Sequence, residues 1–368
     1  MSRLFKLGRA AGSVGAALGV AAAGAAVGFA AERYVVGRSL RGDDPYADEK
    51  FGSLRGSPHT VRTDDGIDLH AEVDEAAAPV TVVFTHGYAL NQDSWHFQRR
   101  DLAGAARLVF WDQRSHGRSV RAPEESITIE RLGRDLGEVL DALVPQGPVV
   151  LAGHSMGGMT ILALAAQRPE LFGDQVVGVA LIATSARDLG KVSLGLPGPL
   201  GRVAHKVAPG LVAALARRPE LVERGRRVGS DLGYVLTRRY SFVESRSASL
   251  VEFTAAMNAA TPIEVVADFL PLFSGHDGRA ALPVLARVPV LVVGAVGDLL
   301  APVEHSRELA DSLPDASYVE VADAGHMVLL ERHDVVTSQL RELVDRVIAE
   351  LPPVAARAGS GRRWWHRR

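Results

Sequence analysis

From residue 60 to about residue 351, short runs rich in β-branched and aromatic residues alternate with amphipathic stretches of ten or more residues. This alternation is typical of βαβ units, in which helices join parallel strands and cover both faces of one sheet. The runs 176–182 and 290–293 are apolar throughout, as expected for strands that are buried on both faces. We therefore predict an α/β fold with a mostly parallel sheet and helices at 129–143 and 335–348, where apolar residues recur at helical spacing. The expected strands are 60–63, 68–73, 80–85, 107–111, 149–153, 176–182, 290–293 and 318–321.

The strand pattern stops between residues 185 and 280. This stretch is rich in Arg, Leu and Ala and predicts several helices, which we interpret as a cap inserted into the main domain. The expected organisation is an Ala/Gly-rich apolar segment at 1–41, a first part of the core at 42–184, the cap at 185–280, a second part of the core at 281–351 and a basic, Trp-containing tail at 352–368.

The composition excludes several classes of function. The chain has 41 basic and 43 acidic residues, so no positive surplus points to nucleic acid as a partner. It has no cysteine, which excludes disulfide scaffolds, thiolate metal sites and cysteine nucleophiles. The remaining candidates for covalent chemistry are side chains such as serine.

Ser155 lies in the sequence Gly153-His-Ser-Met-Gly157, between an expected strand and an expected helix. At so tight a turn the serine backbone is strained and the hydroxyl projects from the edge of the sheet, while glycines two residues away on either side avoid collisions. The motif alone is also compatible with a serine that only caps a helix. Its strand-to-helix context favours a nucleophile.

A serine nucleophile needs a base, and the base needs an acid that orients it. Asp298 follows the expected strand 290–293, and His326 follows the expected strand 318–321. Both positions are at carboxyl ends of strands, where open α/β sheets place their sites. The order Ser155, Asp298, His326 therefore predicts a catalytic triad.

Acyl transfer also needs backbone N–H groups aimed at the developing oxyanion. His86, Gly87 and Tyr88 follow the expected strand 80–85, and Gly87 allows the chain to turn close to the serine. The expected donors are the N–H groups of Tyr88 and of Met156, the latter at the start of a helix.

Together, these motifs resemble those of the serine-nucleophile branch of the α/β-hydrolase superfamily, over roughly residues 60–351. The segment Asp112-Gln-Arg114-Ser-His-Gly117-Arg-Ser119 also resembles a turn of that family, although Ser115 stands where glycine is usual. We interpret Asp112 and Arg114 as structural. The resemblance implies an eight-stranded sheet with a helical cap after the sixth strand, and a serine at position 155 argues against the family's aspartate-dependent epoxide hydrolases and dehalogenases.

The expected function is hydrolysis of a small-molecule carboxylic ester, of esterase or lipase type, without a cofactor or metal. A cofactor-free perhydrolase or haloperoxidase-like enzyme is an alternative, because the same triad serves when peroxide replaces water. A second alternative is a membrane-tethered receptor of this fold without catalysis. The natural substrate, the acyl-chain length and the oligomeric state stay open.

Residues 10–31 form an uncharged run that is long enough to cross a bilayer as a helix, although eleven of them are Ala and five are Gly. We expect this run to anchor the protein to a membrane, with a cleaved signal peptide as the alternative and a secreted or cytoplasmic protein as the consequence if no anchor forms. The tail, with Trp364 and Trp365 among arginines, could also contact membrane lipid.

Overall fold

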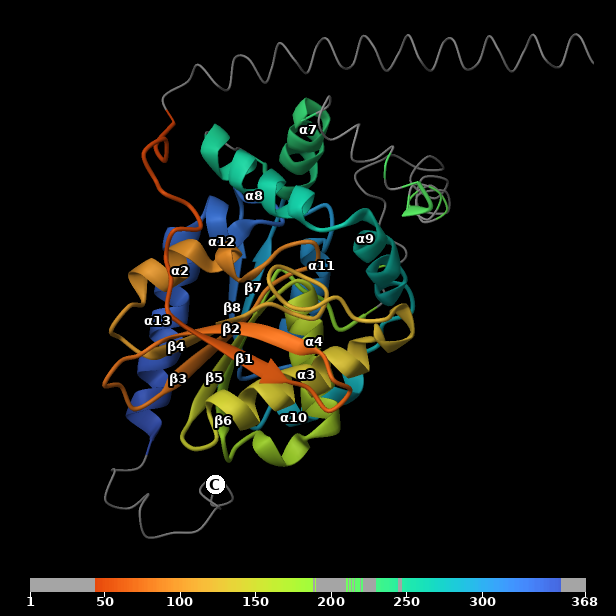
Figure 1. Cartoon of the computed structure of the whole chain (residues 1–368). Helices are drawn as coiled ribbons and strands as arrows, with labels where there is room; N and C mark the ends of the chain where they lie inside the picture. The colour runs from red at the N-terminus through yellow and green to blue at the C-terminus, as the bar shows by residue number, and fades with distance from the viewer. Residues whose placement is uncertain are drawn as a thin grey trace, which may run out of the picture.

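The structure, a computed structural model, describes residues 44–187, 230–243 and 247–351, together with residue 189 and scattered positions between 210 and 220. One eight-stranded sheet forms its centre, with the strand order β1-β2-β4-β3-β5-β6-β7-β8 (Figure 1). β2 runs antiparallel to both of its neighbours, and the pairs from β4 to β8 are parallel. The strands are β1 Ser57–Arg62, β2 Asp68–Asp74, β3 Thr81–Thr85, β4 Arg107–Trp111, β5 Val149–His154, β6 Val176–Ile182, β7 Val290–Ala295 and β8 Ser317–Val321. The predicted α/β class and mostly parallel sheet are confirmed, and all eight expected strands are present within three residues of their expected ends.

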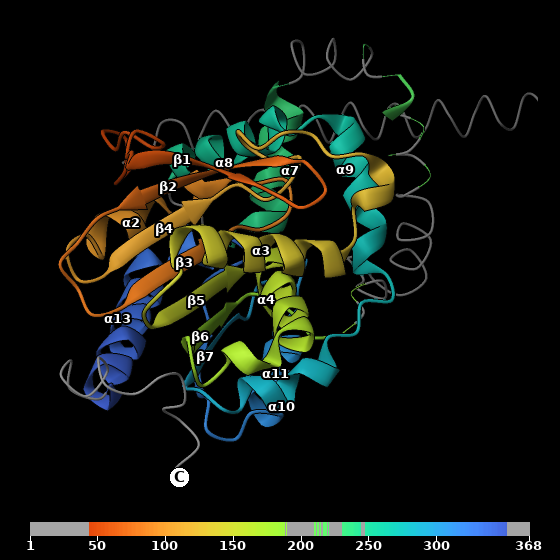
Figure 2. The same ribbon diagram turned by 60° about the horizontal axis from the view of Figure 1, so that its bottom comes forward.

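Helices cover both faces of the sheet (Figure 2). One face packs against α2 His96–Asp101, α12 Val328–Glu331 and α13 His333–Glu350, and the other against α3 Ile129–Leu143, α4 Met156–Gln167, α10 Leu282–Leu285 and α11 Val303–Asp311. Successive residues of a strand alternate between these layers, so Val82 and Phe84 belong to the first core and Val83 to the second. Both predicted helices are confirmed, and Thr128 caps the first by accepting a hydrogen bond from the Arg131 N–H.

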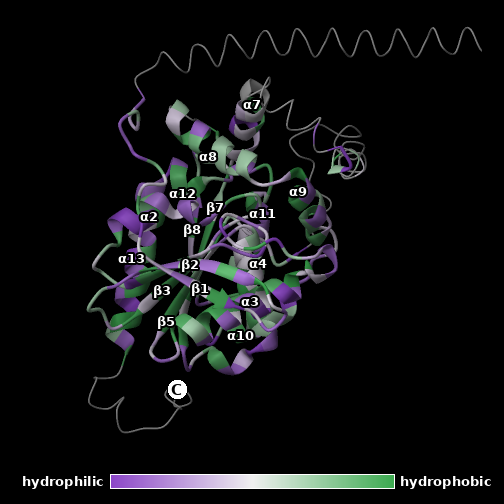
Figure 3. Cartoon of the chain, viewed as in Figure 1, coloured by the Kyte–Doolittle hydropathy of each residue, from purple (hydrophilic) through white to green (hydrophobic). Residues whose placement is uncertain are grey.

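Hydropathy follows this layering. Apolar residues concentrate in the strands, whereas hydrophilic residues mark the outward faces of helices such as α3 and α13 (Figure 3). β3, β5, β6 and β7 are buried along their whole length, which explains their apolar sequences.

Three helices lie beyond the carboxyl ends of the strands: α7 Ser230–Ser241, α8 Ala248–Ala260 and α9 Ile263–Phe269 (Figure 1). We call them the cap helices. The apolar run 10–31 and the tail 352–368 lie outside the described residues. Within the described parts of the chain, every helix is too short or too polar to span a membrane.

Candidate active site

The turn between β5 and α4 holds Ser155 in a strained conformation, with φ of +53° and ψ of −118°. A Cβ atom on Gly157 would lie 2.1 Å from the carbonyl oxygen of Thr85, and a Cβ atom on Gly153 would lie 2.6 Å from the backbone of Gly157. Neither position can hold a side chain unless the backbone moves. The two glycines therefore permit the tight turn that presents the Ser155 hydroxyl at the edge of the sheet.

The structure brings Ser155, His326 and Asp298 together from three loops that follow β5, β8 and β7. The His326 Nε2 atom lies 3.0 Å from the Ser155 hydroxyl oxygen, and its Nδ1 atom lies 2.8 Å from the Asp298 carboxylate. The other carboxylate oxygen accepts hydrogen bonds from the N–H groups of Leu300 and Ala301, both at 2.8 Å. These two bonds fix the plane of the carboxylate and leave one oxygen facing the imidazole.

The loop after β3 passes close to the serine. A Cβ atom on Gly87 would lie 3.2 Å from the Cβ of Ser155 and 2.9 Å from the His154 ring, so only glycine fits at this approach. Within the described part of the chain, neither the N–H of Tyr88 nor the N–H of Met156 has an acceptor. Neither N–H group is therefore committed to another group among the described residues.

Two buried histidines hold this loop in place. The His86 Nε2 atom accepts a hydrogen bond from the Gln113 N–H at 2.9 Å, and its Nδ1–H donates to the Gly87 carbonyl at 2.7 Å. The His116 Nε2 atom accepts from the N–H of Ala89 at 3.2 Å. Burial lowers the pKa of His86 to about 3 and that of His116 to about 4, so both rings are neutral and can serve as acceptors.

A third buried histidine supports the base. The His154 Nε2–H donates to the backbone carbonyl of His326 at 2.9 Å, and burial holds the pKa of His154 well below its ordinary value. Neither His116 nor His154 was expected from the sequence to contribute to the site. His154 lies directly before Ser155, and His116 lies within the turn 112–119. These positions inside the two motifs are the only features of the sequence that could have indicated their roles.

The turn 112–119 forms with serine at position 115. Ser115 adopts φ of +66°, and its hydroxyl oxygen accepts a hydrogen bond from the Ala122 N–H at 2.9 Å. The Asp112 carboxylate accepts from the N–H groups of Gln92 and Arg118. The completely buried Arg114 side chain pairs with Asp135 at 2.6 Å. These contacts join the turn to neighbouring loops, as structural roles for Asp112 and Arg114 require.

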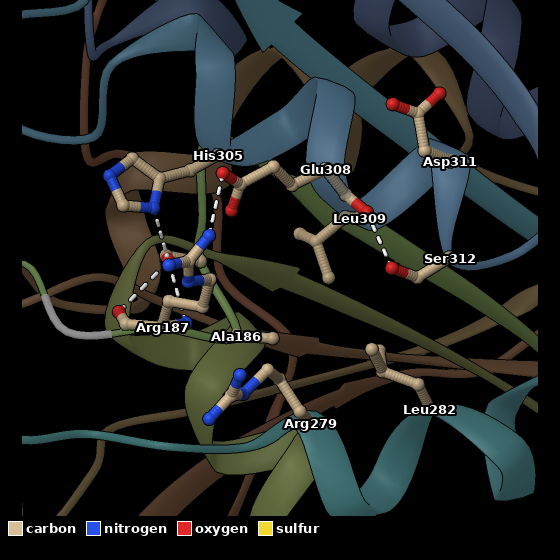
Figure 4. A pocket seen from close by; sticks show the side chains of 10 residues that line it. Ala186, Arg187, Arg279, Leu282, His305, Glu308, Leu309, Asp311 and Ser312 are labelled. Atoms are coloured by element: carbon tan, nitrogen blue, oxygen red, sulfur yellow. Dashed lines mark hydrogen bonds and ion pairs between the residues drawn. The ribbon is translucent and has the colours of Figure 1, made fainter.

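A cavity of about 260 Å³ lies between α11 and the segment before α10, to one side of the sheet (Figure 4). Its lining includes Ser185, whose hydroxyl lies 2.7 Å from the His305 Nδ1 atom, and Arg187, which pairs with Glu308. None of Ser155, Asp298 and His326 lines it, so this cavity is separate from the three-residue cluster. The described residues contain no group of three or more side chains that could hold a metal ion.

The chain is similar to a family of known proteins, to several relatives and to solved structures. The family model for the alpha/beta hydrolase fold matches residues 80–333, more than half of the chain. The chain is 29% identical over 252 residues to the pimeloyl-[acyl-carrier protein] methyl ester esterase of Aromatoleum aromaticum, covering 68% of this chain and 92% of that protein. It is 27% identical to the dihydrolipoyllysine-residue acetyltransferase component of the acetoin cleaving system of Pseudomonas putida, covering 72% of this chain but only 63% of that longer protein.

Among solved structures, a thermophilic esterase from Thermogutta terrifontis matches with a TM-score of 0.62 and 27% identity, covering 79% of this chain and 98% of that one. The family match and the two esterases among these relatives support hydrolysis as the class of activity. This chain is a member of the α/β-hydrolase family.

Proposed function

We propose that this chain hydrolyses carboxylic esters of small molecules through an acyl-serine intermediate. The observation that carries the proposal is the continuous line of hydrogen bonds from Asp298 through His326 to the hydroxyl of Ser155. Such a line makes a serine nucleophilic at neutral pH, because the imidazole takes the proton as the oxygen attacks.

In the first half of the proposed reaction, the Ser155 oxygen attacks the ester carbonyl carbon while its proton moves to the His326 Nε2 atom. The negative charge that develops on the carbonyl oxygen is stabilised by the N–H groups of Tyr88 and Met156. When the tetrahedral intermediate collapses, the bond to the alcohol oxygen breaks, and His326 gives its proton to the departing alcohol. Asp298 keeps the imidazole oriented and stabilises its positive charge.

In the second half, water replaces the alcohol. His326 removes a proton from the water as it attacks the acyl carbon, and the same N–H groups hold the second oxyanion. When this second intermediate collapses, the bond between the acyl carbon and the Ser155 oxygen breaks, His326 gives its proton to that oxygen, and the carboxylic acid is released. Every proton transfer uses a group of this chain, so the proposed cycle needs no cofactor.

The test combines labelling and turnover. Purified protein should react with a fluorophosphonate probe at Ser155 and hydrolyse p-nitrophenyl esters over a series of acyl lengths, and Ser155→Ala should do neither. Peroxide-dependent halogenation, measured in parallel, distinguishes the perhydrolase alternative: faster halogenation than ester hydrolysis would favour it. A protein that neither reacts with the probe nor turns over any ester would overturn the proposal and favour a receptor without catalysis.

We also propose that the apolar run 10–31 attaches the enzyme to a membrane. The Asp44 carboxylate accepts hydrogen bonds from the N–H and the hydroxyl of Ser249 on α8, so the folded part of the chain includes residue 44. A deletion that ends at residue 41 therefore removes the apolar run and leaves this contact in place. The full chain should sediment with membranes, and a chain lacking residues 1–41 should be released with its activity intact. A full chain that stays in the supernatant at low salt would contradict the anchor, and a mature N-terminus near residue 31 would instead establish a signal peptide.

A further inference from the structure

Tyr88 connects the loop after β3 to the cap. Its hydroxyl donates a hydrogen bond to the carbonyl of Val266, in the middle of α9. Its ring lies 5.1 Å from that of Phe273, just beyond α9, in an edge-on contact. Burial raises the pKa of Tyr88, so the hydroxyl keeps the proton that it donates. One residue therefore offers its backbone N–H to the site and fixes its side chain on a cap helix.

The apolar surroundings strengthen this connection. A separate hydrophobic cluster joins the start of α4 to α9 and includes Met156, Val265 and Phe269, with Tyr88 and Phe273 packed against it. Both residues whose N–H groups are the proposed oxyanion donors thus have side chains packed against the cap.

His116 belongs to the same contact. Its ring meets Phe269 edge-on at 4.7 Å while its Nε2 atom accepts the N–H of Ala89, the residue after Tyr88. Ala89 has φ of +55°, in the left-handed region that a non-glycine residue adopts only when its surroundings hold it there. The loop is therefore held by His86 and His116 from the core and by the Tyr88 hydroxyl from the cap.

We propose that the side chain of Tyr88 is a positioning residue that sets the oxyanion donor by fastening its loop to α9. This inference rests on the proposed function, since it concerns the N–H group that would hold the oxyanion. A donor stabilises the transition state only if it is already aimed at the oxyanion before charge develops. Because the Tyr88 hydroxyl fastens the loop to α9, the direction of the Tyr88 N–H depends on the position of this cap helix.

The test is Tyr88→Phe, which keeps the ring and removes only the hydroxyl. The Val266 carbonyl still accepts the N–H of Leu270, so the variant leaves no unsatisfied carbonyl in the cap. The matched control is Tyr318→Phe, which removes a tyrosine hydroxyl bonded to Glu320 on the outer strand β8, away from the loop. Each protein is assayed for hydrolysis of a p-nitrophenyl ester and for inhibition by a trifluoromethyl ketone. Ser155 adds to the carbonyl carbon of this ketone, and the resulting oxyanion occupies the same site as in the ester reaction.

For Tyr88→Phe we expect kcat to fall about 10-fold, a part of the roughly 100- to 1,000-fold cost of losing a donor entirely. The inhibition constant of the trifluoromethyl ketone should rise by a similar factor, because the hemiketal needs the same donor. KM should stay within about two-fold, because the planar ester carbonyl makes weaker demands on the donor. Tyr318→Phe should match the wild type in all three.

Two results would overturn the inference. If kcat and the inhibition constant are unchanged while the melting temperature falls, Tyr88 only stabilises the cap. If KM rises while kcat is unchanged, Tyr88 shapes substrate binding and does not set the donor. Both results presuppose an active wild type. A wild type without labelling or turnover would instead refute the proposed function, and with it the inference.

Discussion

Acidification from pH 7 to pH 5 should destabilise the fold, because His86 and His116 must stay neutral in the folded state. Burial lowers their pKa values to about 3 and about 4, against 6.5 for an exposed histidine. Between pH 7 and pH 5 the unfolded chain therefore gains a proton at each histidine and the folded chain does not. The free energy of unfolding falls by about 2 kcal/mol for each ring, a loss that begins near pH 6.5 and continues until the folded pKa is reached.

Asp112 acts in the opposite direction. Burial raises its pKa to about 6, although two backbone N–H groups bond to its carboxylate. The folded state therefore binds a proton more readily than the unfolded state between pH 6 and pH 4, which returns about 1 kcal/mol by pH 5. Asp65 and Glu72 have pKa values lowered to about 2 from ordinary values of 3.8 and 4.5, so most of the stability that they contribute is lost only below about pH 5. These terms leave a net destabilisation of about 2 to 3 kcal/mol at pH 5, to which His154 adds in the same direction.

Reversible urea unfolding at pH 7, 6 and 5 measures this change directly. The control is His116→Gln, whose amide oxygen can still accept the Ala89 N–H but has no proton to gain. In that variant the loss between pH 7 and pH 5 should shrink by about 2 kcal/mol. A wild type whose stability is flat over this range, or a variant with the same loss as the wild type, would refute the reasoning.

Three further substitutions test the site and the turn that presents it. Ser155→Ala should lower ester hydrolysis by several orders of magnitude with the fold intact, and a variant with half of the wild-type activity would show that another nucleophile acts. Asp298→Asn should reduce kcat by roughly 1,000- to 10,000-fold by favouring the wrong tautomer of the imidazole, whereas an unchanged kcat would move the acid to another carboxylate, with Asp323 the first to test. Gly157→Ala should prevent folding or lower the melting temperature strongly, because the new Cβ would lie 2.1 Å from a carbonyl oxygen of β3. The control is Gly233→Ala on α7, which should be tolerated because the space around it is open. Equal losses of stability in both variants would contradict the predicted clash.

The sheet could be predicted because its strands are buried on both faces. Continuous apolar runs such as 176–182 are typical of strands buried between two layers of helices. Because these strands are parallel, the residues that follow them meet at the same edge of the sheet. For this reason, the proximity of Ser155, Asp298 and His326 could be predicted from the sequence alone. The strand ends were less predictable, since β1 begins at Ser57 with largely exposed residues that leave no apolar signal.

The contacts that hold the site in place could not be predicted in the same way. His116 touches Ala89 across 27 positions, and Tyr88 touches Val266 across 178, so neither pair leaves a periodic or local pattern. Their roles also depend on which nitrogen or oxygen is the acceptor, which only the folded geometry decides. The positive φ of Ala89 could not be predicted either, because alanine rarely adopts this conformation and no sequence pattern indicates it.

The acid sensitivity of the fold and the rigidity of the site have one physical origin. A backbone N–H near the proposed oxyanion site can be held by a carbonyl, a carboxylate or a neutral imidazole nitrogen. A carboxylate would place a fixed negative charge beside the developing oxyanion and oppose it. A neutral ring avoids that charge, and His86 and His116 hold the loop in this way. The consequence is that protonating either ring would replace an acceptor with a donor facing an N–H group. Because the pKa values of the two rings in the folded state are about 3 and about 4, the loop that carries Tyr88 should keep both contacts at pH 5 and be released only near pH 4 and below.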